Sequence, residues 1–233
     1  MEKVKTKHPF LIGVSDALPV ALGLWPIGIT LGVAAGSLGF LLRDMSAMSA
    51  IVYAGSAQFI GVDMLEKGAT AATIITATFF INFRHFMMSS AYAPYLHGKS
   101  VWALLIVSFG ITDETFAVGI TRAKADPNGF GIAYLFGLEF TAWFSWLCAT
   151  VLGILLGGFI PNFEKFGLSF ALPAMFIGLI AMLAKTKTHL LVCLASGVLS
   201  LFLYLIGITN FNVIIAALVV SFAAVGVKYA IKR

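Results

Sequence analysis

Charged residues are scarce in this sequence. Only 11% of its 233 residues are Asp, Glu, Lys or Arg, whereas 60% are hydrophobic. Soluble domains contain about a quarter charged residues, so this deficit excludes a soluble globular protein and indicates a polytopic membrane protein. Because apolar segments recur along the whole chain, we predict an all-α transmembrane permease domain over residues 1–233.

Cysteines and catalytic motifs are also few. Cys148 and Cys193 each lie alone in an apolar run, which predicts neither a disulfide framework nor a zinc site. The sequence has no P-loop and no HExxH motif, and no TVGYG filter. The net charge of +5 reports membrane orientation and not nucleic-acid binding. Nothing in the sequence indicates an enzyme, a cofactor or a metal site.

Eight apolar runs are candidate membrane spans, each of which needs about 20 residues. They cover residues 10–42, 46–65, 69–91, 101–121, 130–160, 170–184, 189–207 and 211–228. With both termini in the cytoplasm, eleven of the fifteen basic residues lie on the cytoplasmic side and three on the outer side, which supports this orientation. Seven spans are the alternative, if the short run 170–184 is re-entrant.

The first and fifth runs are longer than a bilayer is thick. Thirty-odd helical residues reach about 48 Å, against a hydrocarbon core of about 30 Å. The first run contains Pro19 and Pro26, and we predict a broken or sharply kinked helix there because proline removes a backbone donor. One long tilted helix is the alternative.

Two short segments predict an inverted-topology repeat. The segments are ALPVALGLWPIG (17–28) and ALPAMFIGLIAM (171–182), which run in opposite directions by the span count. Their halves would cover about residues 10–91 and 165–230, with a third helix break at Pro173. In transporters such repeats place broken helices around a midplane site. A chance match is the alternative.

Several polar side chains are predicted to lie deep in the membrane. Counting 1.5 Å per residue places Gln58 and Asp113 about 18 Å from the outer boundary and Glu139 about 13 Å from the inner one. Arg84, in FFINFRHFMMSS, lies about 10 Å from the outer boundary by the same count. A charge at this depth costs about 2.5–3.5 kcal/mol, so such residues face the bundle interior and find partners.

The segment around Arg84 is a candidate substrate-binding site. Asn82 and His85 flank Arg84 on different faces and make the helix polar all round. We predict that Arg84 and Asn82 bind substrate, whereas snorkelling of Arg84 to the interface or a purely structural ion pair are the alternatives. His85 is a candidate proton relay, and a structural hydrogen-bonded histidine is the alternative.

The segment AGSAQF is a second candidate substrate-binding element. A helix broken at Gly55 and Ser56 would present backbone N–H groups to a carboxylate, with the Gln58 amide nearby. Simple packing of small residues is the alternative, with Gln58 bonding across helices.

Three carboxyl groups are candidates for proton coupling. Asp113 and Glu114 are adjacent, about 100° apart on a helix, so we expect them to face different directions. A desolvated carboxyl group without a full partner can take up and release protons, which assigns this role to Asp113, Glu114 and Glu139. A carboxyl pair that only neutralises Arg84 is the alternative.

Five motifs follow one another in a recognisable order: ALPVALGLWPIGITLG, YAGSAQFIG, NFRHFMMSSAYAPYL, GITDETFAV and ALPAMFIGL. This order resembles the AzlC family, the large subunits of two-component branched-chain amino acid exporters. The resemblance runs from about Gly13 to the last span. It implies a permease of the bacterial inner membrane that exports valine, leucine, isoleucine and related amino acids such as methionine.

The resemblance also implies a partner, a small AzlD-like membrane subunit. Together with the buried carboxyl groups, it predicts secondary-active export driven by the proton gradient. A channel or accessory subunit without coupled transport is the alternative.

Overall fold

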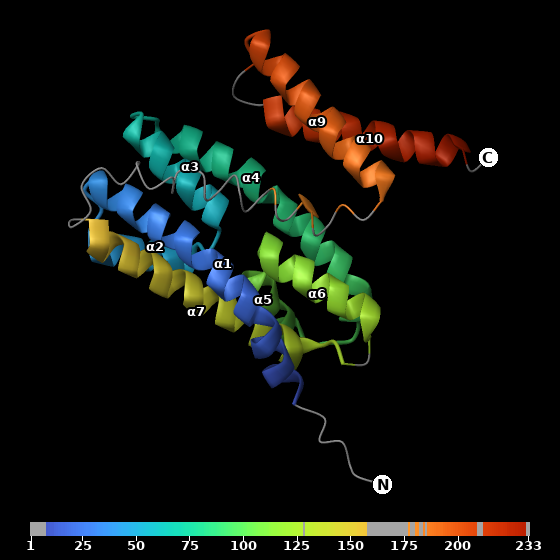
Figure 1. The fold of residues 1–233 in the computed structure, drawn as a ribbon, viewed down its shortest axis with the longest axis horizontal. Coiled ribbons are helices and arrows are strands. Elements are labelled where there is room, and N and C mark those ends of the chain that lie inside the picture. Colours follow the sequence, from blue (N-terminus) through green and yellow to red (C-terminus); the bar gives the residue numbers. More distant parts are fainter. Residues whose placement is uncertain are drawn as a thin grey trace. The chain divides into compact units, whose positions relative to one another are not determined.

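The described part of the chain is helical throughout. The computed structural model describes residues 8–127, 129–157, 177, 180–181, 184, 186–208 and 212–231. These contain helices α1 to α7, α9 and α10 and no strand (Figure 1). Three helices are long and apolar enough to cross a membrane: α1 (Pro9–Ser37), α7 (Ile132–Gly157) and α9 (Lys187–Leu205). The predicted all-α polytopic membrane fold is confirmed.

One predicted span cannot be compared with the structure. The run 170–184 lies almost entirely outside the described residues, and Pro173 lies outside them as well. The choice between seven and eight spans, the third helix break and the inverted repeat therefore stay predictions.

Helices α1 and α7 lie side by side along most of their length (Figure 1). Glycines bring the two backbones into contact. A Cβ atom added to Gly32 would lie 2.7 Å from the backbone nitrogen of Ile154 and 2.8 Å from the Cα of Gly153. Gly13 contacts Tyr134 in the same way. The contacts move toward the C-termini of both helices together, so the two helices run parallel. Small residues allow this close approach inside a membrane.

Helix α1 is continuous through Pro19 and Pro26. The helix is therefore not broken at these prolines but forms one long helix of 29 residues, whereas a kink there stays a prediction. Both prolines lie on the exposed side of α1. The missing donors consequently leave the face packed on α7 intact, and that packing offsets a cost of about 3 kcal/mol per interior proline.

The predicted second span, 46–65, is the first of two broken helices. It consists of α2 (Leu42–Ile51) and α3 (Gly55–Glu66). Between them Tyr53 has a φ of 41°, in the left-handed region that side chains other than glycine rarely adopt. Because α3 begins inside the AGSAQF segment, the predicted helix break at that position is confirmed.

The predicted fourth span, 101–121, is also broken. It consists of α5 (Val101–Gly110) and α6 (Asp113–Ala125). Thr112 caps α6, because its Oγ1 accepts from the backbone N–H of Thr115 at 3.3 Å while the Thr115 hydroxyl accepts from the N–H of Thr112 at 2.8 Å. This reciprocal cap satisfies backbone donors in the middle of an apolar run.

The predicted third span is the continuous helix α4 (Ala71–Tyr92), followed by the 3₁₀ turn η1 (Ala93–Tyr95). It contacts both α3 and α6. Arg84, near the middle of α4, therefore lies within reach of the second half of each broken helix.

Helices α9 and α10 (Asn212–Ile231) belong to a separate unit, residues 177–233, and pack against each other. The side-chain amide of Asn212 donates to the carbonyl oxygen and the hydroxyl of Ser200 at 3.2 Å and 3.1 Å. Helix α9 begins with the polar residues Lys187, Thr188 and His189, and most of its remaining residues are apolar.

Candidate functional site

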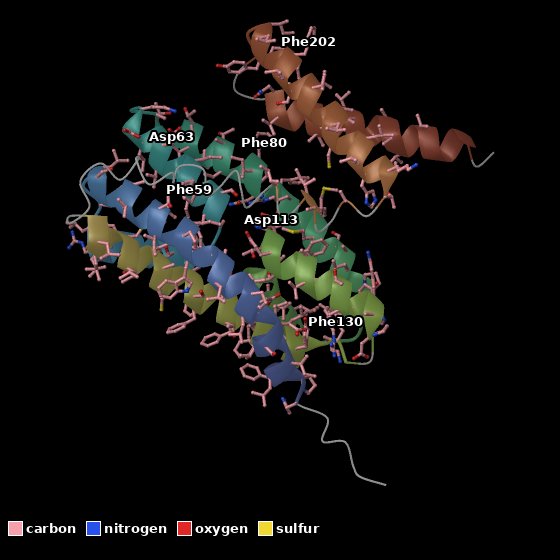
Figure 2. The ribbon with its side chains drawn as sticks, viewed as in Figure 1. Phe59, Asp63, Phe80, Asp113, Phe130 and Phe202 are labelled. Carbon is pink, nitrogen blue, oxygen red and sulfur yellow. The ribbon has the colours of Figure 1, made fainter. Side chains whose placement is uncertain are left out.

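Arg84 joins the two broken helices. Its Nη1 lies 2.8 Å from Oδ2 of Asp113, the first residue of α6, which Figure 2 labels. Its Nη2 donates to the hydroxyl of Ser56, the second residue of α3, at 3.1 Å. The pair is partly buried, with 28% of the Arg84 side chain and 19% of the Asp113 side chain exposed. Two neighbouring helices thus hold the guanidinium, which argues against the snorkelling alternative.

A small cavity lies where these helix starts meet. Its polar lining comes from both breaks and from α4, and comprises Tyr53, Gly55, Ser56, Arg84, His85, Thr112, Asp113 and Glu114. Leu24, Ile27, Ala54 and Trp146 supply an apolar wall. The cavity volume is about 20 Å³, which accommodates a water molecule and not an amino acid. The lining thus combines a cation and two acidic residues with an apolar wall.

Both helix starts contribute partial positive charge to this cavity. The first N–H group that donates within α3 is that of Gln58, to the carbonyl of Ala54 at 2.9 Å. The amides of Gly55 and Ser56 precede it and have no partner within the helix. The N-terminus of a helix favours an anion, so two helix starts and one guanidinium together form a site suited to a carboxylate.

Asp113 and Glu114 both line the cavity. Both residues thus border one cavity, whereas the expectation was that their side chains face different directions. That expectation assumed the middle of an uninterrupted helix, whereas both residues lie in the first turn after a break. A first turn has no preceding turn to separate it from the cavity, so two adjacent residues border the same space.

Gln58 lies beside the cavity and not in its lining. It is 2% exposed, its Nε2 donates to the hydroxyl of Ser49 at 3.2 Å and its Oε1 accepts from Nε1 of Trp146 at 2.9 Å. Gln58 thus ties α2, α3 and α7 together, and the alternative of bonding across helices describes its contacts.

Two further predicted site residues lie elsewhere. Asn82 lines a groove on another face of α4, together with Phe79, Phe83 and Phe86, and does not line the cavity of Arg84. Glu139 is buried on α7 and is also absent from the cavity lining. His85 does line the cavity, beside Arg84.

Tyr53, Thr112 and Trp146 belong to the site although sequence reasoning did not place them there. Thr112 had a detectable signal, because a threonine followed by two carboxylates and a second threonine is the pattern of a helix N-cap. Tyr53 had none, since a tyrosine in the left-handed region follows no local rule. Trp146 reaches the cavity only because α7 packs beside both breaks.

Comparisons with known proteins extend over most of the chain. The family model described as AzlC protein matches residues 19–160. The inner membrane protein YgaZ of Escherichia coli is 27% identical over 217 residues, which are 90% of this chain and 85% of that protein. An uncharacterized membrane protein of Archaeoglobus fulgidus is 28% identical over 220 residues, 94% and 95% of the two chains.

A further relative has a functional name. The branched-chain amino acid transport protein AzlC of Bacillus subtilis is 26% identical over 176 residues, which are 74% of this chain and 67% of that protein. No solved structure matches.

Proposed function

We propose a transport function for this chain, which belongs to the AzlC family: it moves branched-chain amino acids across the membrane. One observation carries the proposal. Arg84 is held between Asp113 and Ser56, at the starts of two broken helices. Broken helices that point N-termini at a buried site are typical of transporters for anionic groups. The name of the Bacillus subtilis relative supports the same substrate class.

The cavity lining accounts for each part of an amino acid. The substrate carboxylate binds the Arg84 guanidinium and the backbone amides that begin α3, because a planar fork and free N–H groups match two carboxylate oxygens. The ammonium group binds Asp113 and Glu114. The branched side chain packs against Leu24 and the neighbouring apolar wall.

Substrate entry requires a change of conformation. A cavity volume of about 20 Å³ does not admit valine, and Asp113 already occupies the guanidinium of Arg84. The substrate carboxylate therefore displaces Asp113, which frees that carboxylate for the substrate ammonium. This exchange of partners at the two helix breaks makes the opening of the cavity depend on the binding of substrate.

The remaining parts of the proposal rest on the sequence. The chain exports valine, leucine, isoleucine and related amino acids from the cytoplasm of a bacterium, driven by the proton gradient. It lies in the inner membrane with both termini in the cytoplasm. A small AzlD-like membrane subunit completes the transporter, and the exposed apolar and aromatic side chains offer helix surfaces for such a partner.

Counterflow in proteoliposomes tests the proposal. Vesicles that contain the chain and its small membrane partner are preloaded with unlabelled valine, and uptake of labelled valine is followed with and without a pH gradient. We expect saturable, gradient-dependent uptake from both subunits together. Non-saturable flux would indicate a channel, and full activity of the single chain would contradict the two-component assembly.

Substitutions of Arg84 test the site in the same vesicles. Arg84→Lys is expected to weaken valine binding about tenfold or more, because a point charge loses the bidentate fork. Lys67→Arg is the control, since the Lys67–Asp63 pair is equally short at 2.7 Å but exposed. If the double variant Arg84→Leu with Asp113→Leu transports normally, the pair is structural and the substrate site lies elsewhere.

A further inference from the structure

Glu139 is a buried acidic side chain that forms no ion pair with any residue the structure describes. It is the eighth of the 26 residues of α7, and only 4% of it is exposed. Its Oε1 is buried without a hydrogen-bond partner, and no ion pair from any residue that the structure describes reaches it. A buried, unpaired carboxylate is strongly disfavoured in its ionised form.

The carboxyl group of Glu139 lies against the last residue of α5. A Cβ atom added to Gly110 would lie 2.6 Å from Oε2 of Glu139 and 2.5 Å from its Cβ. Gly110 ends α5, so the adjacent backbone carries the partial negative charge of a helix C-terminus. Negative charge on Glu139 is therefore opposed by the helix dipole as well as by burial.

The titratable neighbours of Glu139 supply no positive charge. The phenols of Tyr53, at the first break, and Tyr92, the last residue of α4, lie near it. The Tyr92 hydroxyl donates to the carbonyl oxygens of Thr115 and Phe116 at 3.3 Å and 3.4 Å. Both phenols are neutral groups, so neither offsets a carboxylate charge.

We infer that Glu139 is the proton-binding site of the transport cycle, holding a proton against the end of α5 while Arg84 and Asp113 act at the start of α6. The inference rests on the proposed function, because it names which carboxyl group carries the coupled proton. It separates Glu139 from the other three candidates. Asp113 is paired with Arg84, and Glu114 and His85 line the substrate cavity.

A proton fits this position better than a metal ion. The side chain is packed against Gly110, and Glu139 lines none of the described cavities. The described residues also contain no group of three or more His, Cys, Asp or Glu side chains that could hold a metal. A proton needs neither free volume nor additional ligands.

The break between α5 and α6 couples the protonation of Glu139 to the substrate site at Arg84. Only Ile111 and Thr112 separate the helix end that faces Glu139 from the helix start that faces Arg84. Loss of the proton places a full negative charge beside the C-terminus of α5 and repels it. A shift of α5 there is transmitted through two residues to Asp113. In an exporter, Glu139 receives the proton from the outer side and releases it to the cytoplasm.

Glu139→Gln tests this inference in the two-subunit proteoliposomes described above. Its amide hydrogen-bonds but does not titrate, so we expect pH-driven valine accumulation to fall about tenfold more than counterflow exchange, within the usual range of coupling factors. Glu66→Gln, which removes an exposed carboxylate at the end of α3, is the control and should behave like the wild type. Glu139→Asp should retain driven accumulation with an altered pH profile.

An infrared measurement tests the same inference without transport. The purified protein at neutral pH should show the carbonyl stretch of a protonated carboxylic acid, and this band should be lost in Glu139→Gln but kept in Glu66→Gln. If the band is unaffected by Glu139→Gln, the inference is overturned. Driven accumulation by Glu139→Gln at the wild-type level would also overturn it and leave the transport function standing. Absence of counterflow in the wild type would instead refute the proposed function, and the band would still decide the protonation of Glu139.

Discussion

The α1–α7 pair and the two broken spans differ in whether their helices are interrupted, and proline does not account for the difference. Helix α1 contains Pro19 and Pro26 and is continuous. The breaks after α2 and α5 contain no proline, and their connecting residues are Val52 to Ala54 and Ile111 to Thr112. The contrast teaches that in this protein the positions of breaks depend on partners for the freed backbone groups, and not on helix-breaking residues.

The two regions also use their backbones differently. In the α1–α7 pair both helices are continuous, and glycines bring the two helix backbones into contact. At the breaks the helices are interrupted. Thr112 caps the backbone of α6, and Arg84 binds the side chains of Ser56 and Asp113 at the two helix starts. The first region is therefore suited to be a rigid support, and the second to exchange partners.

Gly32→Leu should destabilise the contact between α1 and α7. Atoms of Thr150, Gly153 and Ile154 surround the position of any added side chain, and these are backbone atoms that cannot rotate away. We expect a loss of about 3 kcal/mol or more in the free energy of unfolding, or no folded protein. Thermal unfolding in detergent and membrane yield measure this.

Gly23→Leu is the matched control for Gly32→Leu. It lies on the same helix and has no atom within 4 Å of an added Cβ, so its stability should change by about 0.5 kcal/mol or less. Equal losses in both variants would show that the close contact between α1 and α7 does not decide stability.

Trp146→Phe should loosen the link between the two regions. It removes the donor to Oε1 of Gln58, an amide that is 2% exposed and has no access to water. A buried acceptor without a partner costs about 1–3 kcal/mol in the free energy of unfolding. Trp102→Phe, at a tryptophan that is 78% exposed, serves as the control. If Trp146→Phe is as stable as this control, the amide of Gln58 does not hold the first break.

Thr112→Ala should give the smallest loss of stability, and it tests whether the cap of α6 holds the second break. Removal of an N-cap costs about 1 kcal/mol. Thr70→Ala removes the cap of α4, which has the same 3.3 Å hydrogen bond but is exposed to solvent. We expect Thr112→Ala to lower both thermal stability and valine counterflow and Thr70→Ala to affect neither strongly. Similar effects of the two variants would contradict a special role for the cap at the break.

Composition and local pattern by themselves determined the class of this protein. The excess of apolar residues makes helices in a membrane the favourable arrangement, since a backbone in lipid must satisfy its own hydrogen bonds. The cost of a buried charge identified Arg84 and Asp113, because few residue types at that depth need so specific a partner. The small residues of AGSAQF also indicated the first break, because they are a feature of the local sequence.

Tertiary structure alone decided which of these residues meet. Packing on α7 determined that α1 stays continuous through two prolines, and it placed Gln58 in a structural role beside the cavity. It also placed Asn82 in a separate groove and Glu139 against the end of α5. Such outcomes depend on the relative rotation and contact of helices far apart in the sequence. No local rule specifies these, because the free energy that sets them comes from burial between helices and not from any one segment.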